Sequence, residues 1–144
     1  MVDLRADIVP GRAAAGLALG DSIAPLRHLG GAIAVHESCR DAEILDLGPV
    51  KVWAAGGLID QILVRGEYAG RVAGTHVRIG STLGLFVREV GRLIEDDEDV
   101  LVCPAVPGIG VETTAWSSAD RESIDTNLDA TITDLFVFPP APAS

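Results

Sequence analysis

The sequence predicts an α+β fold built from two tandem α/β repeats, in which short helices pack on an antiparallel sheet. Residues 16–30 and 77–91 share one pattern: a short alternating apolar run, a glycine, two small polar residues, an apolar helix face and a closing glycine. Residues 59–64 and 132–137 have apolar residues at the same three positions. The offset between the two copies is 60 residues at the start (20 to 80) and 73 at the end (59 to 132), so the second copy contains an insertion.

These repeats set the expected domain organisation. A chain of 144 residues suits one compact domain, here residues 1–144, made of two repeats at about 16–66 and 75–138. Residues 139–144 contain three prolines, which cannot pair in a sheet, so they are expected to form a flexible tail.

The first repeat is expected to begin with a short strand at 17–19, followed by a short helix. Asp21 or Ser22 suits the helix N-cap, and Pro25 is tolerated only in the first turn. The apolar positions of this helix are three residues apart, at Ile23, Leu26 and Leu29. Four strands then follow, separated by glycine-containing turns, at 32–36, 43–47, 50–54 and 59–65.

The second repeat follows the same plan. Ser81 or Thr82 is expected to cap a helix with apolar residues at helical spacing, namely Leu83, Phe86, Val87 and Val90. Strands are expected at 100–103, 109–113 and 131–138. The polar segment 117–129 is the expected insertion.

Charge is distributed unevenly along the chain and limits the classes of partner. The net charge is −10, and residues 95–134 contain eleven acidic residues and one basic residue, Arg121, which gives the same −10. Such a surface repels nucleic acid and anionic lipid and attracts basic proteins. We therefore expect no nucleic-acid and no membrane partner. The acidic N-terminal residues do not resemble a signal peptide, which favours a cytoplasmic location.

No motif for metal, cofactor or catalysis is found. His36, Cys39, His76 and Cys103 lack the paired spacing of a zinc site, so we expect no metal and no cofactor. The sequence contains no nucleophile elbow and no phosphate-binding loop, although a Cys–His pair could still meet in space. Both thiols, Cys39 and Cys103, are expected to be reduced, and Cys103 to be buried.

The acidic run at 95–99 has two interpretations. It is either a solvated loop or a surface that recognises a basic protein, since the spacing and glycine of a calcium loop are absent. Under the second interpretation, Trp116 is the main aromatic anchor, and Trp53 and Tyr68 are the other candidate anchors. The expected partner-binding residues are Glu95, Asp96, Asp97, Glu98, Asp99, Trp116, Asp120, Glu122 and Asp125, with Asp129 nearby.

The repeated pattern over most of 16–138 resembles two known families. It looks like the tandem α/β repeats of the β-lactamase inhibitory protein fold and of the outer-membrane assembly lipoprotein BamE (SmpA). The chain lacks the lipoprotein cysteine near the N-terminus and the aromatic-rich sheet expected of the inhibitor family. Segments 8–11, 16–22, 57–60 and 68–70 are similar to small cytosolic proteins found beside bacterial polymorphic toxins, which serve as immunity proteins.

The resulting functional hypothesis is a non-enzymatic cytoplasmic immunity protein that acts in bacterial competition. It would bind and inhibit a cognate, basic toxin domain through its acidic surface, and it needs no catalytic residue. The alternatives are a small-ligand-binding protein or enzyme that uses the cavity of a curved sheet, and an envelope assembly adaptor.

Overall fold

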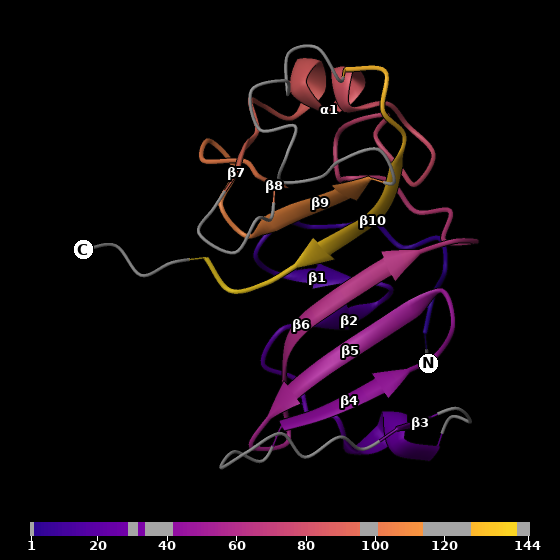
Figure 1. Cartoon of the computed structure of the whole chain (residues 1–144). Helices are drawn as coiled ribbons and strands as arrows, with labels where there is room; N and C mark the ends of the chain where they lie inside the picture. Colours follow the sequence, from indigo (N-terminus) through magenta and orange to yellow (C-terminus); the bar gives the residue numbers. More distant parts are fainter. Residues whose placement is uncertain (1, 29–31, 34–41, 96–100, 114–127, 141–144) are drawn as a thin grey trace.

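The architecture is dominated by one antiparallel sheet. The computed structural model describes residues 2–28, 32–33, 42–95, 101–113 and 128–140. Within these residues the chain forms an eight-stranded sheet, a two-stranded hairpin, a short 3-10 helix and one α-helix (Figure 1). The expectation of an antiparallel, sheet-based fold is confirmed. The helical content is lower than the α+β prediction implied.

The strand order places the two halves of the chain side by side. The order is β3-β4-β5-β6-β10-β9-β8-β7, and all described pairs are antiparallel. The strands are β3 (Ala32–Ile33), β4 (Ala42–Asp46), β5 (Val50–Ala55), β6 (Leu58–Arg65), β7 (Ile94–Glu95), β8 (Leu101–Val102), β9 (Ile109–Thr113) and β10 (Ile132–Val137). Each half therefore forms a meander, and the last strand of each meander lies at the centre of the sheet.

One face of the sheet is covered by the remaining elements. The hairpin of β1 (Ala13–Ala14) and β2 (Leu17–Ala18) lies behind the central strands in Figure 1, and its buried residues belong to the same core as those of β6 and β10. The strand expected at 17–19 is thus β2, and it pairs with β1 instead of joining the large sheet.

The two helices differ in type. The first is a five-residue 3-10 helix, η1 (Ala24–His28), where a short helix over Ile23–Leu29 was expected. The second is α1 (Leu83–Glu89), and Thr82 caps it by accepting a hydrogen bond from the Leu85 N–H at 3.1 Å, as predicted. Of the four apolar residues predicted for this helix, Leu83 and Phe86 are fully buried, whereas Val87 and Val90 are partly buried.

Equivalent hydrogen bonds join the segment before each helix to a central strand of the sheet. The Gly20 N–H donates to the Ile59 carbonyl at 2.8 Å, and the Gly80 N–H donates to the Ile132 carbonyl at 2.9 Å. Both glycines have a positive φ, +90° and +96°, which a side chain disfavours. In return, the Ile59 N–H donates to Asp21 and the Ile132 N–H donates to Ser81, each at 2.8 Å.

The core is aliphatic and lies between the sheet and the covering elements. On the central strands its residues alternate along the chain, as a half-buried sheet requires. Fully buried examples are Val50, Val52, Ile62, Val64, Leu135 and Val137. Among the described residues, no helix is long and apolar enough to cross a membrane.

Candidate functional site

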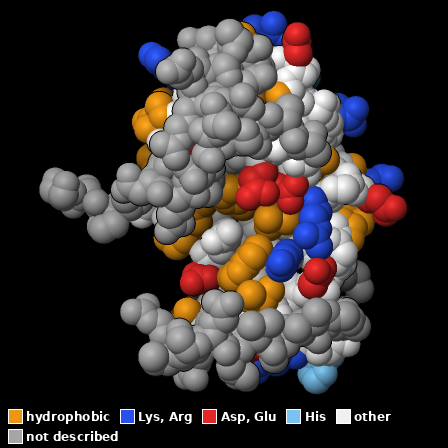
Figure 2. Space-filling model, viewed as in Figure 1, with side chains coloured by type: hydrophobic (Ala, Val, Ile, Leu, Met, Phe, Trp, Pro, Cys, Tyr) orange, Lys and Arg blue, Asp and Glu red, His pale blue; other side chains and the backbone are white. Residues whose placement is uncertain are grey.

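The candidate site is the face of the central sheet that points away from the core. Because strand residues alternate between faces, the neighbours of the core residues on β4, β5, β6, β9 and β10 point to this side. We call it the outer face, defined by Asp46, Lys51, Trp53, Leu63, Arg65, Gly110, Glu112, Asp134 and Phe136. Figure 2 shows acidic and basic side chains meeting beside apolar ones on this side of the molecule.

An apolar strip crosses the middle of the outer face. Leu63 and Phe136 lie directly opposite each other on β6 and β10, and only 8% and 6% of their surface is exposed, although neither belongs to the core cluster. The Phe136 ring lies over Gly110 of β9, where a Cβ atom would come within 2.2 Å of the ring. Gly110 therefore makes room for the ring, and the Phe138 ring follows at 6.2 Å between centroids.

Trp53 extends the apolar strip toward the first half of the sheet. It is half-buried, and the Lys51 ammonium lies 5.1 Å from its ring centroid, in a cation–π contact. No aromatic-rich sheet was expected from the sequence. The structure nevertheless brings Trp53, Phe136 and Phe138, from distant segments, to the side of the sheet opposite the core. This grouping depends on long-range pairing between β6 and β10, which local patterns do not specify.

One positive charge of the outer face is held by neighbouring groups of the chain. The Arg65 guanidinium bonds both oxygens of Asp46 at 3.1 Å and donates to the Gly48 carbonyl at 3.0 Å. The Gly48 N–H in turn donates to Asp46 at 3.0 Å. The Gly48 hydrogen bond, and then the Arg65 guanidinium, lower the pKa of Asp46, against the effect of partial burial.

Two carboxylates lie in the same row of the outer face as Arg65, next to the apolar strip. Glu112 of β9 and Asp134 of β10 are directly opposite each other in the ladder. Loss of solvent, and then the charge of Asp134, raise the pKa of Glu112. Among the described residues, neither carboxylate forms an ion pair. This pair could not be predicted from the sequence, because only the β9–β10 register brings the two residues together.

Most of the expected partner-binding residues fall outside the described part of the chain. Glu95 lies partly buried on β7, at the edge of the sheet, and Asp129 is exposed in the turn before β10. The residues outside the described ranges are Asp96, Asp97, Glu98, Asp99, Trp116, Asp120, Glu122 and Asp125.

Tyr68 is not a surface anchor, contrary to the expectation. Only 3% of its surface is exposed. Its hydroxyl donates to the Ala6 carbonyl and accepts from the buried Ala15 N–H at 2.9 Å, which ties the N-terminal segment to the link between the two halves. Gly70 supports this contact, because a Cβ atom there would lie 2.0 Å from the Ala6 carbonyl oxygen. The role of Tyr68 is therefore structural.

The structure describes two of the four residues that were considered as zinc ligands, Cys103 and His76. Cys103 is buried and carries a free thiol, as predicted, whereas Cys39 and His36 lie outside the described residues. His76 contacts Glu89, to which its backbone N–H donates at 2.7 Å. Among the described residues, no three potential metal ligands come together.

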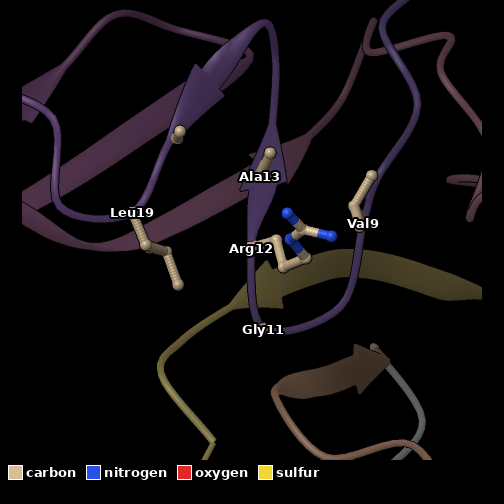
Figure 3. A pocket seen from close by; sticks show the side chains of 6 residues that line it. Val9, Gly11, Arg12, Ala13 and Leu19 are labelled. Carbon is tan, nitrogen blue, oxygen red and sulfur yellow. The ribbon is translucent and has the colours of Figure 1, made fainter.

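An open depression lies beside the β1–β2 hairpin. Its volume is about 480 Å³, and it is lined by Val9, Gly11, Arg12, Ala13, Ala18 and Leu19. Figure 3 shows the Arg12 guanidinium directed toward Val9. Arg12 is the one ionisable side chain of this lining, so the depression offers a single positive charge among small apolar groups and no acid–base pair.

We compared the chain with known protein families, curated proteins and solved structures. No family model, no curated protein and no solved structure matches it. Its function must therefore be inferred from its own residues and contacts.

Proposed function

We propose that this protein is a non-enzymatic cytoplasmic immunity protein that binds and inhibits a cognate bacterial toxin domain. The observation that carries the proposal is the outer face. Its apolar strip consists of the half-buried Trp53 and the largely buried Leu63 and Phe136. Charged groups adjoin this strip: Arg65, Asp134 and Glu112 form the row next to it, and Lys51 lies over the Trp53 ring. Protein interfaces likewise place aromatic side chains beside charged and polar groups.

The charge of the chain supports a basic partner. The net charge of −10 derives from residues 95–134, which include Glu112 and Asp134 of the outer face as well as the predicted acidic residues 95–99. Attraction between opposite charges accelerates encounter, and buried anchors slow dissociation, which together suit an inhibitor. The acidic segments and the outer face are proposed to act on the same partner.

We further propose that the scaffold consists of two tandem α/β repeats in one domain. Its support is the equivalence of the Gly20–Ile59 and Gly80–Ile132 hydrogen bonds, together with the symmetric strand order. The β5–β6 and β9–β10 ladders also share an irregularity, which skips Asp60 in one and Thr133 in the other. Pairing β6 with β10 merges the halves into one wide sheet, which a single meander could not provide.

The experiment is a neutralisation assay with the reading frame directly upstream. The domain at its C-terminus is expressed in bacteria with and without this protein, and growth and binding by calorimetry are measured. Restored growth and a one-to-one complex are expected. A domain that is toxic yet is neither bound nor neutralised contradicts the proposal, as does a metabolic operon around the gene.

A further inference from the structure

We draw no further inference here: the strongest candidate, the open depression beside the β1–β2 hairpin, is a largely apolar hollow in which the exposed Arg12 is the one charged side chain among the described residues, and nothing in the structure shows what covers it.

Discussion

Leu63 of β6 and Phe136 of β10 lie directly opposite each other at the centre of the sheet. In the neighbouring pairs of the same ladder, Val64 lies opposite Leu135, and Ile62 lies opposite Val137. All four flanking residues are fully buried in the core on the other side. The junction of the two halves is therefore held by the core on one face and by the Leu63–Phe136 contact on the other.

Gly110 provides the first prediction. Gly110→Ala should lower the free energy of unfolding by about 1–3 kcal/mol, because the new Cβ would overlap the Phe136 ring. Urea denaturation measures the loss. In a Phe136→Leu background the same substitution should cost less, since the smaller side chain can move away. An equal cost in both backgrounds would show that the ring is not what excludes a side chain at Gly110.

A second prediction concerns Tyr68. Tyr68→Phe should lower the free energy of unfolding by about 1–3 kcal/mol, because the buried Ala15 N–H loses its acceptor and the Ala6 carbonyl loses its donor. Affinity for the partner should stay unchanged, as measured by calorimetry, because the side chain is buried. A large loss of affinity with unchanged stability would restore Tyr68 as a contact residue.

Tyr68 also illustrates which features could be predicted from the sequence. Local patterns were sufficient for α1 with its Thr82 cap, for the central strands and for the burial of Cys103. They could not show that Tyr68 bonds a segment more than fifty residues away, or that Glu112 meets Asp134. Those contacts depend on the β9–β10 register and on the path of the N-terminal segment, which are properties of the folded chain.

The short helix predicted near Pro25 is present, but it is a 3-10 helix over Ala24–His28. Proline removes one backbone donor, and η1 spans only five residues, so a 3-10 helix forms instead of a regular α-helix. The site was predicted least well. The residues expected from the sequence were selected by charge and as isolated aromatics, whereas the outer face is assembled from five strands.

The cap of α1 gives a third prediction. Thr82→Ala should cost about 1 kcal/mol in the free energy of unfolding, because the Leu85 N–H loses its acceptor. Thr82→Ser should retain most of the stability, which thermal denaturation can test. Ser22→Ala, at the equivalent place before η1, is expected to cost less, since its hydroxyl accepts at 3.2 Å and the helix is shorter. A larger cost at Ser22 than at Thr82 would contradict this ranking.

Asp46 gives a prediction for pH. Its pKa is lowered in the folded protein, so its ionised form stabilises the fold above the pKa of the unfolded chain, and this contribution is lost as pH falls through the folded pKa. Asp46→Asn should therefore cost about 0.5 kcal/mol at neutral pH and progressively less in acid. Urea denaturation at several pH values measures the difference. A cost that stays constant down to the most acidic pH would mean that the charge is not responsible.

The last prediction concerns the acidic segment and Trp116, which lie outside the described residues. If residues 95–99 steer a basic partner, association should slow as salt rises, because such attraction is screened over about 10 Å at 0.1 M. Replacing Asp96, Asp97 and Asp99 by Asn should chiefly reduce the association rate. Trp116→Ala should instead raise the dissociation rate, with a loss of binding free energy of about 2 kcal/mol. Stopped-flow kinetics and surface plasmon resonance separate the two effects. If the association and dissociation rates change neither with salt nor with these four substitutions, the acidic segment and Trp116 only keep the protein soluble. The outer face around Trp53 alone then carries the interaction.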